Sequence, residues 1–316
     1  MRKPAAEDRS KIEWTEYTWN PWQGCHHASP GCDNCYMFSD LRRHGRDPEN
    51  VVRSKTTFDK PLEIARKHPE GRVIFTCSWS DWFLKEADPW RDEAWDIIRR
   101  TPQNTYLILT KRHGRMARCL PPDWGDGYPN VALGVSVENQ EWADARVPVL
   151  LRDVKARWKY VSYEPALGPV RFSAINDGSW HDREGADLYD SLRGASYWRN
   201  GDHGLGGGPK LDLVIIGGES GGGARANELQ WTRDVLAECR DAGVAGFNKQ
   251  NGVKATDGGK TVVNLRSRKG GDILDIPADL RVRQLPPGMN PRWQNDPPIA
   301  APVSRLRDII AAGATV

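Results

Sequence analysis

Seven short apolar runs, separated by polar loops and by segments of helical periodicity, dominate the pattern along the chain. They are Thr15–Pro21, Arg72–Ser78, Thr105–Lys111, Asn130–Asn139, Arg157–Pro165, Leu211–Ser220 and Val244–Gln250. Most are nearly continuous rather than alternating, which is typical of strands buried on both faces of a parallel sheet. Apolar residues at helical spacing follow several of them, as in Trp90–Arg100 and in Leu229–Gly243, where a glycine ends the helix.

This repeated order of strand, loop and helix predicts an α/β fold, a partial (β/α)6-type parallel barrel. Residues 172–210 make an unusually long connection, which we interpret as an insertion between strands five and six that could cap the barrel. We assign residues 1–250, with that insertion, to the barrel. Residues 251–316 then form a C-terminal extension, partly disordered from about Leu285 except for a helix at 304–312.

Composition limits the class of protein. Hydrophobic residues make up 38% and charged residues 28% of the chain, which is typical of a globular protein. There is no apolar run of about 18 residues for a membrane span, and the charged start is unlike a secretory signal. We therefore expect a cytoplasmic protein. The net charge of +3 neither requires nor excludes nucleic acid as a partner.

The six cysteines divide into two groups. Cys25, Cys32 and Cys35 lie in one loop directly after the first strand, with the spacing C-x6-C-x2-C. The others, at 77, 119 and 239, lie in apolar runs and are expected to be buried and inert. In a reduced compartment, a cluster of cysteines indicates a metal site.

Two metals suit this loop. Three thiolates can bind three irons of a [4Fe–4S] cluster and leave the fourth iron open, whereas an electron carrier normally uses four cysteines. The alternative is a structural Cys3His zinc site completed by His26, His27 or His44. The spacing alone leaves both open, together with a coincidental grouping of reduced cysteines. The position of the loop at the carboxyl end of a barrel strand, where active sites are built, favours the iron–sulfur cluster.

Several motifs together resemble a known family. They are IEWTEYTWNPWQGCHHASPGCDNCY, CSWSDWF, LTKR, GVSVEN, VSYEPALGPV, VIIGGESGGGAR and GFNKQNG, followed more loosely by RKGGDILD. Over roughly residues 12–275, apart from 172–210, the chain resembles the phage Gp37/Gp68-like family (DUF5131), which is radical S-adenosylmethionine-like and has a three-cysteine motif. The chain departs from the common radical-enzyme motif, which has three residues between its first two cysteines and an aromatic residue where this chain has Asn34.

The resemblance implies that Cys25, Cys32 and Cys35 bind a [4Fe–4S] cluster and that S-adenosylmethionine chelates its open iron. One electron, from a flavodoxin- or ferredoxin-type donor, would then cleave S-adenosylmethionine to a 5′-deoxyadenosyl radical. The phage association suggests a nucleotide or a modified base in DNA, such as a thymine derivative, as substrate, in the host cytoplasm if the chain is phage-encoded. An amino-acid or peptide substrate remains open.

Polar residues at the strand ends are the remaining candidates. Those expected to bind the cofactor are Tyr36, Ser78, Asp81, Lys111, Glu138, Ser162 and Gly218, and those expected to be catalytic are Glu138, Glu164, Glu219 and Lys249. Asp81 could instead cap the following helix, and Lys111 could be solvated. Because Glu138 and Glu164 follow neighbouring strands, we do not expect both to be satisfied by ion pairs. The glycines of Gly217–Gly223 lack the order of a phosphate loop, but they allow close approach of a ligand.

A function of a different class is also consistent with the sequence: a zinc- or cluster-containing nucleic-acid-binding protein without catalysis. The pattern of a parallel sheet speaks against it. So do the carboxylates expected at several strand ends, because they would repel phosphate.

Overall fold

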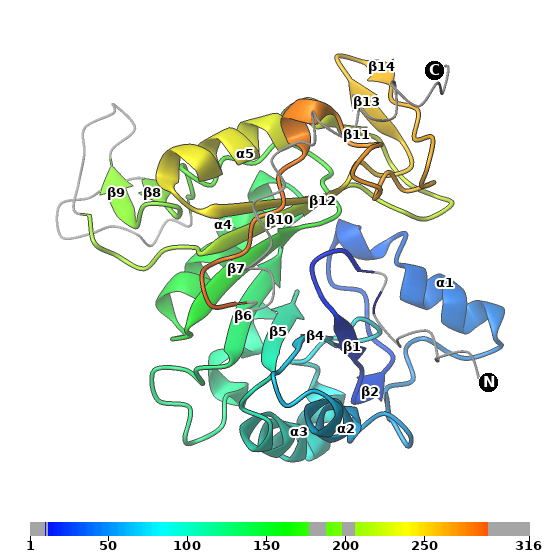
Figure 1. Cartoon of the computed structure of the whole chain (residues 1–316), viewed down its shortest axis with the longest axis vertical. Coiled ribbons are helices and arrows are strands. Elements are labelled where there is room, and N and C mark those ends of the chain that lie inside the picture. The colour runs from blue at the N-terminus through cyan, green and yellow to red at the C-terminus, as the bar shows by residue number, and fades with distance from the viewer. Residues whose placement is uncertain (1–9, 11, 177–187, 198–205, 290–316) are drawn as a thin grey trace.

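The computed structural model describes residues 10, 12–176, 188–197 and 206–289. Its central feature is a sheet of seven strands in which every neighbouring pair is parallel. In spatial order the strands are β1 (Tyr17–Trp19), β4 (Val73–Thr76), β5 (Thr105–Thr110), β6 (Val131–Ser136), β7 (Trp158–Tyr163), β10 (Leu213–Gly217) and β12 (Ala245–Gln250). Spatial order therefore follows chain order, and the sheet curls into a half-barrel (Figure 1).

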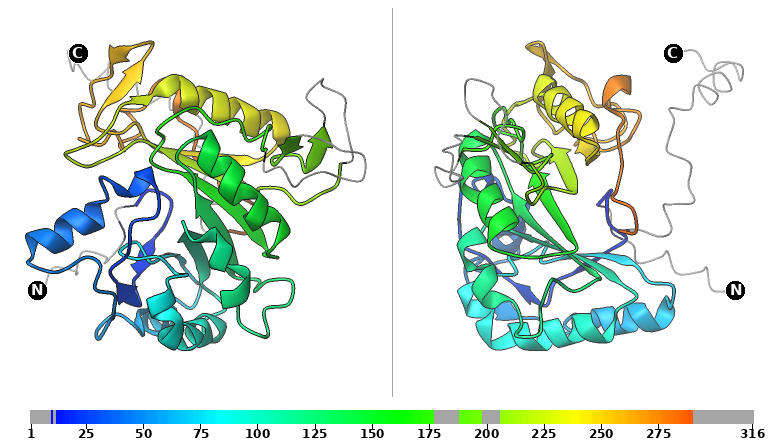
Figure 2. Two further views of the ribbon diagram at one scale, coloured as in Figure 1. Left: turned by 180° about the vertical axis from the view of Figure 1, so that it is seen from behind. Right: turned by 90° about the vertical axis from the view of Figure 1, so that its left-hand side faces the viewer.

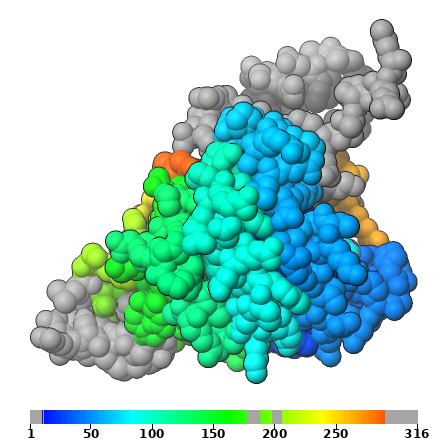
Figure 3. Space-filling view, turned by 90° about the horizontal axis from the view of Figure 1, so that it is seen from below, coloured from blue at the N-terminus to red at the C-terminus, as the bar shows by residue number. Residues whose placement is uncertain are grey.

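The helices lie mainly on the outer side of this half-barrel. They are α1 (Tyr36–Arg43), α2 (Lys60–Lys67), α3 (Asp88–Arg100), α4 (Gln140–Arg152) and α5 (Leu229–Ala242). Figure 2 shows α3, α4 and α5 along the outer face, whereas α1 projects near β1 at one end. Seen from below, consecutive segments of the chain lie side by side (Figure 3).

Short strands form additional small sheets outside the seven-stranded sheet. Antiparallel pairs join β2 (Trp22–Gln23) to β3 (Val52–Arg53), β8 (Leu188–Asp190) to β9 (Ala195–Tyr197), and β13 (Ala255–Asp257) to β14 (Lys260–Thr261), while β11 (Asn227–Glu228) pairs with β13. Short 3-10 turns occur at Pro30–Cys32, Lys85–Ala87, His113–Arg115, Ala117–Cys119 and Ala278–Leu280.

Alternation along the strands divides the apolar residues between two cores. In β5, Tyr106 and Ile108 pack into the large core beneath the helices, whereas Leu107 belongs to a smaller core on the inner side. The large core holds a chain of tryptophans, with ring centroids of Trp82 and Trp95 5.0 Å apart and those of Trp95 and Trp124 5.3 Å apart. Such contacts contribute both apolar burial and favourable ring geometry.

The sequence predicted the order of the main strands. All seven runs form strands of one parallel sheet, and the two helices predicted at Trp90–Arg100 and Leu229–Gly243 are α3 and α5. After β5 the chain forms two 3-10 turns, His113–Arg115 and Ala117–Cys119, and no α-helix before β6. Seven strands form the half-barrel, so the sixfold detail of the predicted barrel remains a prediction.

Other expectations concern the connections and the ends. The β8–β9 hairpin lies between β7 and β10, but residues 177–187 and 198–205 of the predicted insertion lie outside the described residues. So do the charged start of the chain and the helix predicted at 304–312. No helix in the described ranges combines the length and apolar character needed to cross a bilayer.

The part of the C-terminal region that is described returns to the sheet. The Arg283 backbone forms a β-bridge with Phe247 of β12, and Met289 is fully buried in the inner core. The division into residues 1–250 and 251–316 remains a prediction.

Candidate active site at the carboxyl edge of the half-barrel

A cavity of about 310 Å³ lies at the carboxyl ends of the parallel strands, at the lower end of the size range of small-molecule sites. Its walls include residues at or just after the carboxyl ends of β4, β5, β7 and β12. They include Cys25, Cys32, Cys35, Tyr36, Ser78, Asp81, Lys111, Arg112, Ser162, Glu164, Lys249 and Lys269. A second cavity of about 180 Å³, beside the glycine-rich turn after β10, shares Cys35, Tyr36, Lys111 and Glu164 with the first.

All three clustered cysteines border the larger cavity, and each is a partly exposed free thiol. Burial, followed by the negative charge of Asp81, raises the pKa of the Cys25 thiol to about 12. Among the described residues, no group of three or more His, Cys, Asp and Glu side chains is close enough to hold one metal ion.

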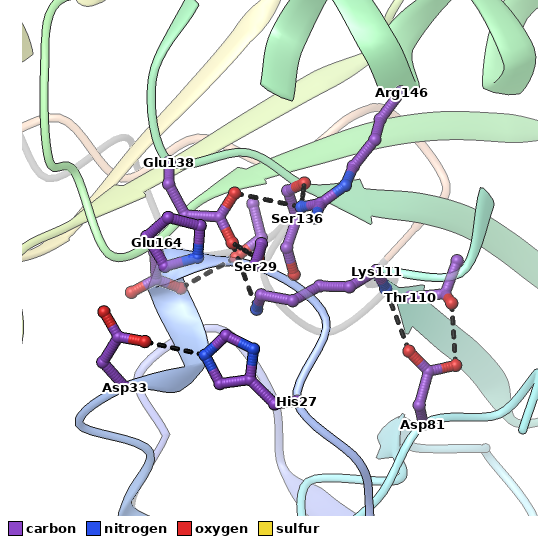
Figure 4. Close-up of polar contacts among 12 residues, drawn as sticks. His27, Ser29, Asp33, Asp81, Thr110, Lys111, Ser136, Glu138, Arg146 and Glu164 are labelled. Atoms are coloured by element: carbon purple, nitrogen blue, oxygen red, sulfur yellow. Dashed lines mark hydrogen bonds and ion pairs between the residues drawn. The ribbon is translucent and has the colours of Figure 1, made fainter. Parts of the chain in front are cut away.

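We call Cys25–Cys35 the cysteine loop, and we call the contacts that hold it to the sheet its anchors. The first anchor lies at the end of β6. Ser29 donates its hydroxyl to Glu138 Oε1 at 2.6 Å, and Arg146 of α4 donates to Glu138 Oε2 at 3.0 Å (Figure 4). Glu138 and the Arg146 side chain are fully buried. A Cβ on Gly31 would lie 2.4 Å from Glu138 Oε1, so only glycine fits against this carboxylate.

The second anchor comes from the turn after β10. Arg225 donates to Asp33 Oδ2 at 3.0 Å and to the Pro30 carbonyl at 2.8 Å, and it also pairs with Glu219. Glu219 accepts a further hydrogen bond from Asn34 at 3.1 Å. Burial raises the pKa of Glu219, but hydrogen bonds from Arg225 outweigh burial and the net pKa is lowered. The carboxylate is therefore ionised and holds both Arg225 and the loop.

The third anchor is Arg112, directly after β5. Its guanidinium donates to the His26 carbonyl at 2.9 Å and lies 3.9 Å from Cys25 Sγ. Three residues between Cys25 and Cys32 make these contacts: His26, Ser29 and Pro30. They contact the ends of three different strands or the turns that follow them. The long first gap of the cysteine motif lets one loop span this edge of the sheet.

Asp81 joins the ends of β4 and β5. Its carboxylate accepts hydrogen bonds from Thr110 Oγ1 at 2.7 Å, from the Lys111 backbone at 2.9 Å and from the Phe83 backbone at 2.9 Å. Asp81 borders the cavity, but its carboxylate oxygens already accept hydrogen bonds from these three donors. Lys111 Nζ lies 3.7 Å from Glu138 Oε1, so this lysine points toward the cavity side of the first anchor (Figure 4).

Glu164 and Lys249 face each other across the sheet, from the ends of β7 and β12. Lys249 Nζ lies 2.9 Å from Glu164 Oε1, and Ser162 donates to Glu164 Oε2 at 3.2 Å. Glu138 and Glu164 are therefore both ion-paired, contrary to the expectation from their sequence positions. The expectation was wrong because the partners Arg146 and Lys249 come from separate elements.

Tyr36 and Ser78 meet at the mouth of the cavity. The Tyr36 hydroxyl donates to the Ser78 carbonyl, while half of the tyrosine surface remains exposed. Burial of the hydroxyl raises the pKa of Tyr36. Gly218 packs against the Asn251 carbonyl, where a Cβ would come within 2.4 Å, so its place is fixed by backbone packing.

The structure thus brings the predicted residues to one edge, although not all to the cavity. Glu138 is fully buried and is absent from the lining of both cavities, and Glu219 borders only the smaller one. Sequence reasoning missed Ser29 and Arg146. Arg146 had a signal, because it lies between the apolar helix positions Ala143 and Val147, where an unpaired charge would be costly.

The other three cysteines differ from one another. Cys77 and Cys239 are buried, as expected, but Cys119 is partly exposed in a 3-10 turn. Cys77 also borders the larger cavity and has a φ of 55°, which is rare for a residue with a side chain.

The fold and the site define an α/β half-barrel protein with a cysteine-bordered cavity at the carboxyl edge of its sheet. The chain belongs to the family described as "Protein of unknown function (DUF5131)", whose model matches residues 9–279. Comparison with curated proteins and with solved structures gave no significant match.

Proposed function

We propose that this protein is a radical S-adenosylmethionine enzyme, in which Cys25, Cys32 and Cys35 bind a [4Fe–4S] cluster. The observation that carries the proposal is that three thiols from one loop border one cavity, whose other walls combine polar strand ends with apolar side chains such as Trp14 and Phe75. Bound there, the cluster would supply the electron that cleaves S-adenosylmethionine to a 5′-deoxyadenosyl radical.

The residues around the loop suit such a group in chemistry and number. Thiolates are the usual ligands of iron–sulfur clusters, and three of them leave one iron open for S-adenosylmethionine. The Arg112 guanidinium, 3.9 Å from Cys25 Sγ, would offset negative charge on the bound thiolates. Since Cys25 carries its proton at neutral pH, loading must release that proton.

Different residues serve the loop and the cosubstrate. Glu138 acts as a positioning residue, because it holds the cysteine loop through Ser29 and does not line the cavity. Tyr36, Ser78 and Ser162 are the candidates for contacts to S-adenosylmethionine. Lys111 could bind its carboxylate group, since the lysine ammonium borders both cavities.

Glu164 and Lys249 are the candidates for acid–base work on the substrate. They form an ion pair that borders both cavities, so a proton can move between groups already in contact. As substrate we propose a nucleotide or a DNA base such as a thymine derivative. The electron would come from a flavodoxin- or ferredoxin-type protein.

Anaerobic reconstitution with iron and sulfide tests the proposal. The wild-type chain should become brown and bind about four irons. With dithionite and S-adenosylmethionine it should then form 5′-deoxyadenosine. Cys32→Ser should lose both properties, while Cys239→Ser, a buried cysteine remote from the cavity, should keep them.

Two results would count against the proposal. A colourless protein with one tightly bound zinc per chain would favour the nucleic-acid-binding alternative instead. A protein with a fully loaded cluster that forms no 5′-deoxyadenosine would support cluster binding. It would contradict the cleavage of S-adenosylmethionine.

A further inference from the structure

The loop Val263–Arg268 stands beside the cavity and exposes both aliphatic and basic side chains. Leu265 is 86% and Val263 70% exposed, the largest values among the exposed large hydrophobic residues. Arg266 and Arg268 are exposed as well. Two exposed aliphatic side chains beside positive charge make this loop a candidate surface for contact with a partner.

Hydrogen bonds fix the backbone conformation of this loop, and that conformation exposes these side chains. The Asp275 carboxylate accepts hydrogen bonds from the backbone nitrogens of Leu265, Arg266 and Ser267, at 2.8, 2.9 and 2.7 Å. Asn264 bonds to the Gly252 carbonyl at 2.8 Å and to the Asn251 side chain at 3.1 Å. The loop is therefore fastened to the chain that leaves β12, with its side chains turned outward.

The loop also continues into the cavity wall. Lys269, the next residue after Arg268, lines the larger cavity and pairs with Glu13 at 2.8 Å. The Gly270 carbonyl accepts from the Asn251 backbone at 3.0 Å, directly after β12 and its catalytic candidate Lys249. A molecule that contacts Leu265 is thus adjacent to the reaction centre proposed above.

Exposed basic residues lie in two regions, the C-terminal segment that contains the loop and the segment of α1. Lys254, Lys260, Arg266 and Arg268 are exposed on the C-terminal side, and no ion pair found among the described residues involves any of them. Arg42, Arg43 and Arg46 are exposed in and after α1. Figures 1 and 2 place α1 and the β13–β14 hairpin on the same side of the half-barrel.

We propose that the loop Val263–Arg268 binds a polynucleotide, with Arg266 and Arg268 on phosphates and Leu265 between two bases. The inference rests on the proposed function and narrows its substrate from a free nucleotide to a base within a strand. Apolar side chains that enter the base stack unstack it, and an enzyme that acts on a base must take that base out of the stack.

The charge pattern favours nucleic acid over an acidic protein. Exposed basic side chains in two regions of the same side of the half-barrel match a continuous polyanion that contacts both, with one base reaching into the cavity. An acidic protein surface would not call for an exposed leucine directly before the two arginines. An anionic membrane surface would also suit an exposed leucine beside arginines. Binding to lipid vesicles is therefore measured in the test.

Binding of a fluorescein-labelled single-stranded oligonucleotide, followed by fluorescence anisotropy over a salt series, tests the phosphate contacts. For the double variant Arg266→Glu/Arg268→Glu we expect at least about tenfold weaker binding. The slope of log Kd against log salt should fall by ~1.4, about 0.7 for each lost contact. The double variant Arg66→Glu/Arg118→Glu makes the same charge change at exposed residues away from the cavity and should bind like wild type.

Leu265→Ala tests the insertion. In a duplex labelled with 2-aminopurine, wild-type protein should raise the fluorescence of the unstacked base, and Leu265→Ala should lose most of this rise while affinity changes less than threefold, about 0.6 kcal/mol. Leu274→Ala, a less exposed leucine outside the loop, is the matched control.

The inference is overturned if wild-type protein does not bind DNA, or if the arginine variant keeps the wild-type affinity and salt slope. It is also overturned if the chain binds anionic phosphatidylserine vesicles through Leu265 and ignores DNA. None of these readouts needs iron or S-adenosylmethionine, so the Cys32→Ser variant should bind DNA normally. Loss of radical chemistry with intact DNA binding would refute only the proposed function.

Discussion

The large core and the carboxyl edge of the sheet are stabilised in different ways. Beneath the helices, the large core is apolar and aromatic, and Trp19, Trp82 and Trp95 are all fully buried. At the carboxyl edge, the cysteine loop is held by polar pairs such as Ser29–Glu138 and Asp33–Arg225. Apolar packing is non-directional, whereas hydrogen bonds fix distances and angles.

The stability of the fold and the geometry of the cysteine loop should therefore depend on different residues. A substitution in the large core should lower the free energy of unfolding and affect the site only through unfolding. A substitution of a loop anchor should displace the cysteines even where the fold survives. The following predictions test that separation, from the largest expected effect to the smallest.

Trp95→Ala should have the largest effect on stability. Trp95 is fully buried between Trp82, Trp124 and Tyr128, so truncation loses apolar burial and leaves a cavity. We expect a loss of about 3–5 kcal/mol in the free energy of unfolding, measured by urea denaturation. The fraction that remains folded should load iron as the wild type does. Impaired loading in that folded fraction would break the comparison.

Glu138→Ala should lower both stability and cluster loading. It leaves the buried Arg146 guanidinium without its carboxylate, at a cost of about 3 kcal/mol, and it frees Ser29. The double variant Glu138→Leu/Arg146→Met should recover most of the stability, since it removes both charges. It should not recover iron loading, because Ser29 still lacks its acceptor. Recovery of both would show that the loop needs no anchor at β6.

Arg225→Ala should change stability little and the loop considerably. Arg225 is partly exposed, so we expect a loss of about 1 kcal/mol or less. Reaction of the apo protein with Ellman's reagent should become severalfold faster, because Pro30, Asp33 and Glu219 lose their shared donor. Arg233→Ala removes a comparable arginine, paired with Asp257 and Asp279. Equal thiol reactivity in the two variants would contradict the anchor.

The smallest effect concerns pH. Because the pKa of Glu219 is lowered in the folded chain, its contribution to holding the loop is complete above the unfolded value of about 4.3 and is lost as pH falls through the folded value. Limited proteolysis at Asn34 and its neighbours should therefore increase only below about pH 4.3. In Glu219→Gln this increase should be smaller, since only Asp33 still titrates in the anchor, and cleavage should be faster at all pH values. A rise near neutral pH would assign the transition to another group.

The sequence predicted the fold well, because each strand of a parallel sheet carries its own signal. Val131–Ser136 is apolar on both faces and is followed by a helix that Asn139 caps, so its place can be recognised locally. The candidate residues were predicted to lie at the strand ends, where the structure has most of them, but their contacts were not predicted. Ser29 and Glu138 are 109 residues apart, and no local pattern encodes that pairing. Glu138 was expected in the cavity because it follows a strand, but Arg146 holds it beneath the cysteine loop.

The anchors of the cysteine loop also set an order of events during synthesis. The cysteines lie between residues 25 and 35, while their anchors are Arg112, Glu138 and Arg225. A nascent chain emerges from its N-terminus, so the thiols leave the ribosome long before the last anchor. Until Arg225 has been made, the cysteine loop lacks its second anchor. The loop can therefore reach the geometry described above only when most of the chain has been translated.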